Sequence, residues 1–156
     1  MASERSEVFH LDDVDKAIIR ELQVDGRVPF AQLSPKVGLS QAAVRQRVKR
    51  LTERGVMQVV AVTDPLSLGL STQAMVGIAV TGDVRAVAAA VAALEESEYV
   101  LITAGRFDVL AEGICTDNEA LLELVNDRIR SIDGVTSTEV FSILKMEKLV
   151  FSWGTG

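Results

Sequence analysis

The chain has 156 residues, with 48% hydrophobic and 24% charged residues and a net charge of −6, values typical of a folded globular protein. A single Cys and a single His exclude a disulfide within the chain and argue against a cysteine-based metal site or a histidine-dependent catalytic site. The longest apolar run, Ala86 to Leu94, is nine residues, well short of the roughly 20 that cross a bilayer. With no secretory pattern at the amino terminus, we expect a cytoplasmic protein without a membrane partner, catalytic residues, metal or cofactor.

The first two elements are predicted to be short helices. Apolar residues recur at helical spacing over 11–22, and Asp12 or Asp13 stands where a helix cap is expected. A second helix is expected over 29–37. Pro35 should kink or end this helix, because proline lacks the backbone donor that a helix interior needs.

A third helix and a strand follow. Gly38 is expected to form the turn before it, and Ser40 to cap a helix over 41–54. Its apolar residues are three and four apart, which places them on one buried face: Val44, Val48 and Leu51. Gly55 should end this helix, and the β-branched stretch 56–62 predicts a strand. Three helices with a tight turn between the second and third are typical of a helix-turn-helix DNA-binding unit.

Charge is distributed unevenly along the chain. Residues 1–64 hold ten Lys and Arg against nine Asp and Glu, a balance of +1, whereas residues 65–156 hold six against thirteen, a balance of −7. The segment 36–54 carries six basic residues against Glu53 alone. Two interpretations stay open on charge alone: a solvated helix face, or a local positive field that attracts a polyanion.

The second part of the chain alternates strand-like and helical patterns. Strands are expected over 72–81, 99–103, 107–115 and 135–148, and helices over 83–96 and 118–132. The order βαββαβ predicts a ferredoxin-like domain, an antiparallel sheet with two helices on one face. We therefore divide the chain into a helix-turn-helix domain (1–64), a linker (65–71) and a ferredoxin-like domain (72–156).

Five segments, in this order and spacing, resemble the Lrp/AsnC (feast/famine) family of transcription regulators over about residues 11–150. They are LDDVDKAIIRELQVDGR, LSQAAVRQRVKRLTERGVM, the Asp-Pro and Leu-Gly pairs at 64–69, the GRFD turn at 105–108 and the GVTSTEV entry to the last strand. The resemblance implies an α+β protein, with an N-terminal winged helix-turn-helix followed by a ferredoxin-like βαββαβ domain of the RAM (AsnC) type.

The polar face of the third helix suits the major groove of double-stranded DNA. Its N-terminal half is expected to read base edges, because Gln can pair with adenine, Arg with guanine, and an Ala methyl can contact thymine: Gln41, Ala42, Arg45 and Gln46. Other polar residues are expected to bind phosphates and fix the register: Ser40, Arg47, Lys49 and Arg50. The alternative for each arginine is a solvated surface residue.

The resemblance also implies oligomers and an effector. Family members form dimers through their C-terminal sheets, and the dimers assemble further into octameric rings or open helices. A small effector, usually an amino acid, binds between dimers. The matching residues lie in one turn and at the start of the last strand: Thr103, Ala104, Gly105, Arg106, Phe107, Asp108, Thr136, Ser137 and Thr138.

The chemistry of this turn fits a zwitterion. Gly105 lets backbone N–H groups approach a carboxylate, Arg106 can bind that carboxylate as a fork, and Asp108 can accept the ammonium. The alternative is that Gly105 only forms a hairpin turn and Asp108 only caps it.

These observations favour a sequence-specific DNA-binding transcription regulator, modulated by an amino acid and associated with the nucleoid. The alternative function is a nucleoid-organising protein that uses the same helix without a working effector site. An enzyme on the ferredoxin-like domain is disfavoured, because residues 65–156 contain no His, no paired Cys and no nucleotide-binding loop.

Overall fold

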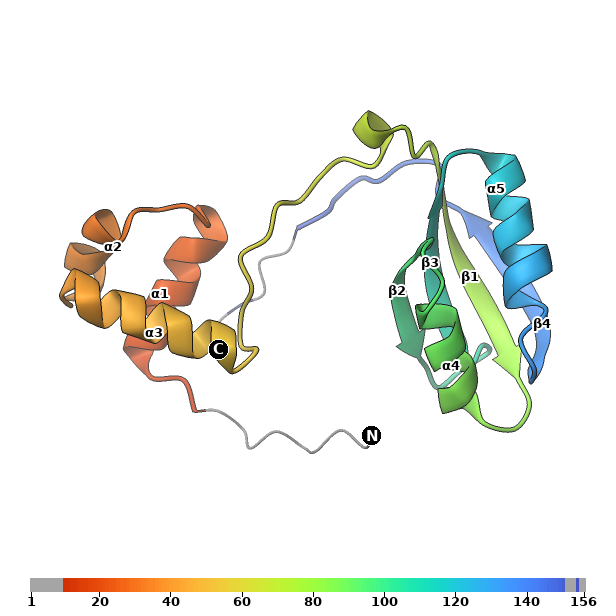
Figure 1. The fold of residues 1–156 in the computed structure, drawn as a ribbon, viewed down its shortest axis with the longest axis horizontal. Coiled ribbons are helices and arrows are strands. Elements are labelled where there is room, and N and C mark those ends of the chain that lie inside the picture. The colour runs from red at the N-terminus through yellow and green to blue at the C-terminus, as the bar shows by residue number, and fades with distance from the viewer. Residues whose placement is uncertain (1–9, 151–153, 155–156) are drawn as a thin grey trace. The chain divides into compact units, whose positions relative to one another are not determined.

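The computed structural model describes residues 10–150 and 154, and the chain divides into two compact units (Figure 1). One unit holds the described residues up to Ala61 and from Leu149 onward, and the other is Val62–Lys148. Each unit has its own cluster of buried apolar side chains. Within the described part of the chain, no helix is both long and apolar enough to cross a membrane.

Three helices build the first unit: α1 (Asp13–Val24), α2 (Phe30–Val37) and α3 (Gln41–Glu53). Asp12 caps α1, since its Oδ1 accepts the backbone N–H of Asp15 at 2.7 Å. Ser40 caps α3 through the N–H of Ala43 at 3.2 Å. Gly38, with φ of 70°, makes the left-handed turn between α2 and α3. The predicted helix-turn-helix is confirmed.

Pro35 does not end α2, which was one of the two outcomes predicted for it, a kink being the other. The helix continues to Val37 and ends at Gly38. Pro35 lies in the last turn, so it removes only one backbone hydrogen bond. The hydroxyl of Ser34 donates to the carbonyl of Phe30 at 2.6 Å and adds a bond within the same helix.

The predicted strand over 56–62 is wrong. The sheet contains only β1 to β4 of the second unit, and in the described residues this β-branched stretch has no regular secondary structure and no partner strand. Val59, Val60 and Val62 are more than half exposed. A strand needs a second strand for its backbone hydrogen bonds, and strand-like composition alone cannot supply one.

The second unit is a four-stranded antiparallel sheet in the order β2-β3-β1-β4, with α4 and α5 on one face (Figure 1). This is the predicted ferredoxin-like fold. Its strands are β1 (Thr72–Val80), β2 (Ser97–Ile102), β3 (Val109–Cys115) and β4 (Val135–Ser142). Its helices are α4 (Val84–Ala92), α5 (Asn118–Glu123), the π-helical η2 (Leu124–Ile129) that continues α5, and the short 3-10 turn η1 (Leu66–Leu68) ahead of β1.

Alternation along β1 sets the two faces of the sheet. Ala74, Val76 and Ile78 are fully buried and face the helices. Cys115 is buried in the same core, and burial raises the pKa of its thiol. Gly113 of β3 packs under a helix: a Cβ at this position would lie 2.8 Å from Cδ2 of Leu124 in η2.

The last strand is shorter than predicted. β4 ends at Ser142, not at residue 148. Its partner β1 begins at Thr72, so the last paired residues are Ala74 and Ser142, followed by a single bond from the N–H of Ile143 to the carbonyl of Gln73. Beyond that point only Thr72 remains of β1.

We predict that Gly113→Ala lowers the free energy of unfolding of the second unit by about 1–3 kcal/mol, the usual cost of overpacking. The new methyl group would displace Leu124, which is only 2% exposed. Gly105→Ala is the matched control, because a Cβ there meets nothing within 4 Å, and its effect should stay within about 0.5 kcal/mol. Urea denaturation of both variants measures the difference. Equal stability of the two would contradict the tight contact at Gly113.

Candidate DNA-binding and effector sites

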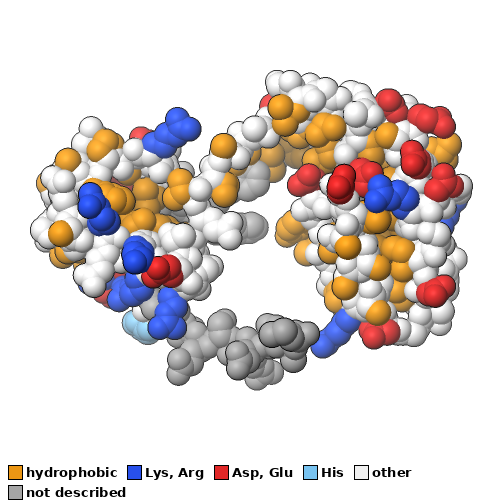
Figure 2. Space-filling model, in the orientation of Figure 1, with side chains coloured by type: hydrophobic (Ala, Val, Ile, Leu, Met, Phe, Trp, Pro, Cys, Tyr) orange, Lys and Arg blue, Asp and Glu red, His pale blue; other side chains and the backbone are white. Residues whose placement is uncertain are grey.

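The N-terminal half of α3 is exposed on the side away from the core. Val44 and Leu51 are fully buried, whereas the predicted base-reading residues are all exposed: Gln41, Ala42, Arg45 and Gln46. Figure 2 shows several Lys and Arg side chains gathered on the visible face of the first unit, and many Asp and Glu side chains over the second. The structure therefore presents this part of α3 as a polar surface next to positive charge.

A buried carboxylate joins α1 to α3. Asp15 is 1% exposed and accepts hydrogen bonds from Arg47 Nη1 at 2.8 Å and from Arg50 Nη2 at 2.7 Å. Arg47 Nη1 also donates to Oδ2 of Asp12 at 2.6 Å. This bond to Arg47 holds the pKa of the Asp12 carboxyl below its usual range. We call these four residues the α1–α3 charge cluster.

The charge cluster changes the expectation for two arginines. Arg47, predicted to bind phosphate, has a guanidinium that already serves two carboxylates, and its side chain is 27% exposed. Those same hydrogen bonds raise the pKa of Arg47. Arg50 is engaged by Asp15 as well, but it is 46% exposed and keeps an outward side. Nothing local in the sequence could reveal these pairs, because the partners lie 32 and 35 residues apart.

The remaining polar residues of α3 behave differently. Among the residues that the structure describes, Lys49 makes a single ion pair, a long and exposed one with Glu53 at 3.6 Å, an arrangement of little energetic weight. The guanidinium of Arg45 lies over the ring of Phe30 in α2, 5.9 Å from its centroid. The sequence predicts Phe30 only as an inward-facing residue of the second helix, not as part of the DNA-binding site.

The turn from Thr103 to Asp108 is closed by its own hydrogen bonds. The hydroxyl of Thr103 donates to the carbonyl of Phe107 at 2.6 Å, and its N–H donates to the carbonyl of Asp108 at 2.9 Å. Oδ2 of Asp108 accepts the N–H of Val80 at 2.7 Å. The carboxylate that was expected to receive a ligand ammonium therefore already binds the end of β1. Ala104 and Gly105 are exposed at the tip.

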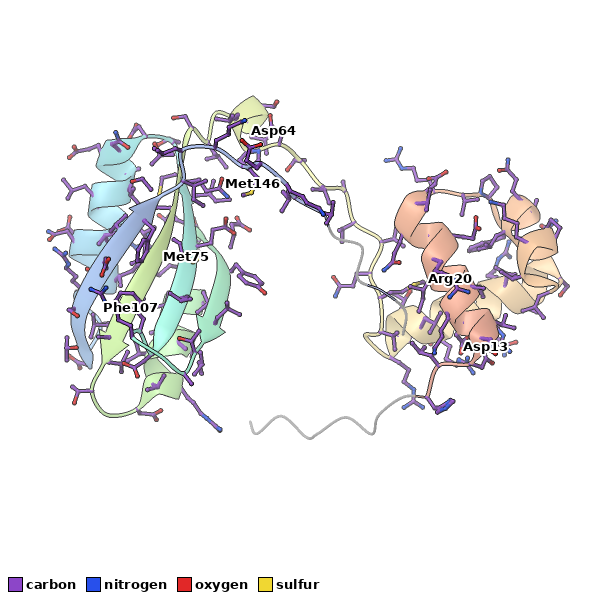
Figure 3. The ribbon with its side chains drawn as sticks, turned by 180° about the vertical axis from the view of Figure 1, so that it is seen from behind. Asp13, Arg20, Asp64, Met75, Phe107 and Met146 are labelled. Atoms are coloured by element: carbon purple, nitrogen blue, oxygen red, sulfur yellow. The ribbon has the colours of Figure 1, made fainter. Side chains whose placement is uncertain are left out.

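Arg106 and Phe107 lie over the sheet face that α4 and α5 leave uncovered, where Figure 3 shows Phe107 and Met75. Arg106 Nη2 binds Oε2 of Glu139 at 2.8 Å, and both side chains are at least 40% exposed. The Arg106 guanidinium also lies 5.3 Å from the Phe107 ring centroid. Phe107 packs on Gly77, where a Cβ would lie 2.5 Å from the ring, and meets Phe141 edge-on at 6.1 Å.

The three predicted residues of β4 do not lie on one face of the sheet. Ser137 pairs with Ala79 and shares the uncovered face with Glu139, whereas Thr138 pairs with the buried Ile78 on the helix side. The hydroxyl of Thr136 donates to the carbonyl of Ala79 at 3.0 Å, next to an irregularity in the pairing of the two strands. The hydroxyl oxygen of Thr138 accepts a bond from Arg130 Nε at 2.8 Å. Glu139, which was not predicted, is the β4 residue bound to Arg106.

Metal binding finds no support in the described part of the chain, where no group of three or more His, Cys, Asp or Glu side chains could hold an ion.

Known proteins match the chain over nearly its full length. An AsnC-type helix-turn-helix domain model matches residues 11–52, and an Lrp/AsnC ligand-binding domain model matches residues 73–149. The HTH-type transcriptional regulator FL11 of Pyrococcus furiosus is 37% identical over 140 residues, which cover 88% of this chain and 92% of that protein.

Two similar solved structures contain an amino acid. A transcriptional regulator of Neisseria meningitidis in complex with L-methionine is 30% identical, with a TM-score of 0.82 over 92% of this chain and 96% of that one. A feast or famine regulatory protein of Mycobacterium tuberculosis complexed with L-methionine is also 30% identical, with a TM-score of 0.84 over 93% and 99%. The chain therefore belongs to the Lrp/AsnC family of transcriptional regulators, with a DNA-binding helix-turn-helix domain followed by a ligand-binding domain.

Proposed function

We propose that the protein binds specific DNA sequences through α3 and that an amino acid modulates this binding. The observation that carries the DNA part is the exposed N-terminal half of α3, which a Ser40 cap begins and a buried apolar face orients. Gln41, Ala42, Arg45 and Gln46 are assigned to base edges, since they present the donors, acceptors and methyl group that the major groove distinguishes.

Ser40, Lys49 and the outward side of Arg50 are assigned to phosphates, which position the helix without reading sequence. Arg47 is assigned to holding α3 against α1, because two carboxylates already occupy its guanidinium. A charged hydrogen bond to a buried group contributes more to folding than an exposed pair does.

Substitutions should separate these roles. We expect Arg45→Ala to weaken binding to a duplex selected by the wild-type protein from a random pool by about 1–3 kcal/mol, with little effect on random duplex. Lys49→Ala should weaken both alike and reduce the slope of log affinity against log salt by about 0.9, the value for one phosphate contact. Quantitative gel-shift titrations at several salt concentrations measure both. An equal loss of specificity in the two variants would show that the assignment of α3 faces is wrong.

Arg47→Ala belongs to the same series. It should lower the free energy of unfolding of the first unit by about 1–3 kcal/mol, because Asp15 stays buried with one partner fewer. The variant molecules that remain folded should bind DNA with the same slope of log affinity against log salt as the wild type. A slope reduced by about 0.9 would instead place a phosphate at Arg47.

Self-association through the uncovered sheet face is part of the proposal. Two rows of side chains cross this face from β2 to β4: Tyr99, Glu112, Met75 and Phe141, and Leu101, Leu110, Gly77 and Glu139. Tyr99 is 53% exposed and Phe141 45% exposed. A dimer built on this face would pair two reading helices, as recognition of two half-sites requires, and further assembly of dimers would give an octamer.

Phe141→Glu should shift the protein toward monomers, because it places a charge at the β4 end of the proposed dimer contact, where an apolar ring now stands. Leu144→Glu is the matched control: Leu144 is 96% exposed and follows the end of β4. Multi-angle light scattering gives the mass of each variant. An unchanged mass for Phe141→Glu, or an equal fall in both, would remove this face from the interface.

The effector site is proposed at the Thr103–Asp108 turn, between dimers. Arg106 would bind the ligand carboxylate, assisted by the backbone at Gly105, and Glu139 would bind the ammonium, so that the ligand replaces their mutual ion pair. Asp108 keeps the turn attached to β1. The L-methionine complexes of the two relatives support an amino acid as ligand, and Phe107 offers apolar surface for its side chain.

L-methionine should raise the melting temperature of the second unit of the wild-type protein, because a ligand that binds only the folded state stabilises that state. Arg106→Gln should weaken L-methionine binding about ten- to a hundredfold, the worth of one charged hydrogen bond. Arg85→Gln, an equal charge change on the exposed start of α4, should leave it unchanged. Calorimetry measures the affinity of each of these two variants for L-methionine. If none of the proteinogenic amino acids binds, the nucleoid-organising alternative gains support.

A further inference from the structure

We infer that Phe30 determines part of the DNA sequence preference, by fixing the direction of the Arg45 guanidinium. Phe30 is a positioning residue in this account and does not itself contact DNA. The inference rests on the proposed base-reading role of Arg45, and the experiment below separates the failure of one from the failure of the other.

The electrostatics of α3 single out Arg45. Arg47 and Arg50 are bound by the carboxylates of the α1–α3 charge cluster, and Lys49 is paired with Glu53. Arg45 is the one cation of α3 for which the residues described by the structure supply no carboxylate. Its charge is therefore not neutralised within the protein, and it stands on the exposed side of the helix.

Phe30 provides a fixed platform for that charge. It is the first residue of α2, and its side chain is partly buried against the apolar cluster of the first unit. The Arg45 guanidinium lies 5.9 Å from the centroid of its ring, within the range where a cation is attracted to an aromatic face. Because Phe30 belongs to the neighbouring helix, its ring couples the direction of Arg45 to the packing of α2 on α3.

An aromatic face can hold a guanidinium in place and still leave its N–H donors available, which a carboxylate cannot do. A carboxylate would occupy N–H groups of the guanidinium and cancel its charge, whereas a ring attracts the cation through its face and leaves the five N–H donors at the edge available. Guanine is read by two parallel hydrogen bonds from one guanidinium, so the plane of that group matters. A side chain already restrained near its bound direction loses less rotamer freedom on binding.

A double-mutant cycle tests this on the full-length protein. The variants are Phe30→Leu, Arg45→Ala and their combination, titrated with a duplex selected by the wild type and with a random duplex. Phe30→Leu should weaken binding to the selected duplex about two- to fivefold, the strength of an exposed cation–aromatic contact, and leave the random duplex unchanged. In the Arg45→Ala background, Phe30→Leu should have no further effect.

Controls separate positioning from folding. Phe30→Tyr keeps an aromatic face and should retain wild-type preference, whereas Phe30→Met keeps apolar bulk without a ring and should behave like Phe30→Leu. Melting temperatures of all variants show the effect on stability. If Phe30→Leu weakens both duplexes equally, or adds fully to Arg45→Ala, the inference is overturned while base reading by Arg45 stands. If Arg45→Ala leaves the ratio of the two affinities unchanged, the base-reading assignment fails and the inference fails with it.

Discussion

The orientation of α3 depends on a carboxylate that water does not reach. Asp15 lies inside the first unit with two guanidinium groups around it, and leaving this buried charge with no partner at all would cost about 3–5 kcal/mol. Apolar packing of Val44 and Leu51 decides which face of α3 is buried. The arginine pairs add direction, because hydrogen bonds to a fixed acceptor tolerate little rotation or sliding. The N-terminal half of α3 contributes no residue to the charge cluster, and it stays exposed on the side away from the core.

In the second unit, one sheet face serves two proposed purposes. α4 and α5 cover the other face, so the rows that cross from β2 to β4 are left free of helices, and Gly77 allows the Phe107 ring to pack directly on the backbone of β1. The Arg106–Glu139 ion pair stands beside that ring. A ligand that separates this pair would act on residues of the same surface that we propose for self-association. Binding and assembly would then be linked, and each would change the other by the same factor.

Local signals were sufficient for much of the fold. Asp12 and Ser40 act as caps and Gly38 as a turn because a cap or a turn involves only residues close in sequence. Strand signals were sufficient only where a partner exists: β4 ends where β1 runs out, and 56–62 has no partner among the described strands. The candidate sites were located by motif, but the bonding partners of their side chains could not be predicted. Those partners depend on pairs such as Arg106 with Glu139 that only the folded chain brings together.

The separate cores of the two units have a thermal consequence. The buried cluster of the first unit, Ile18, Ile19, Leu33, Val44 and Leu51, shares no residue with the larger cluster of the second. A small helical unit with few buried side chains has little stability in reserve, so heating should melt it while the sheet unit is still folded. Each unit would then have its own melting temperature, and the whole chain would not unfold in one transition. Warming would then release the protein from DNA and leave the sheet face proposed for self-association folded, so that binding could return on cooling.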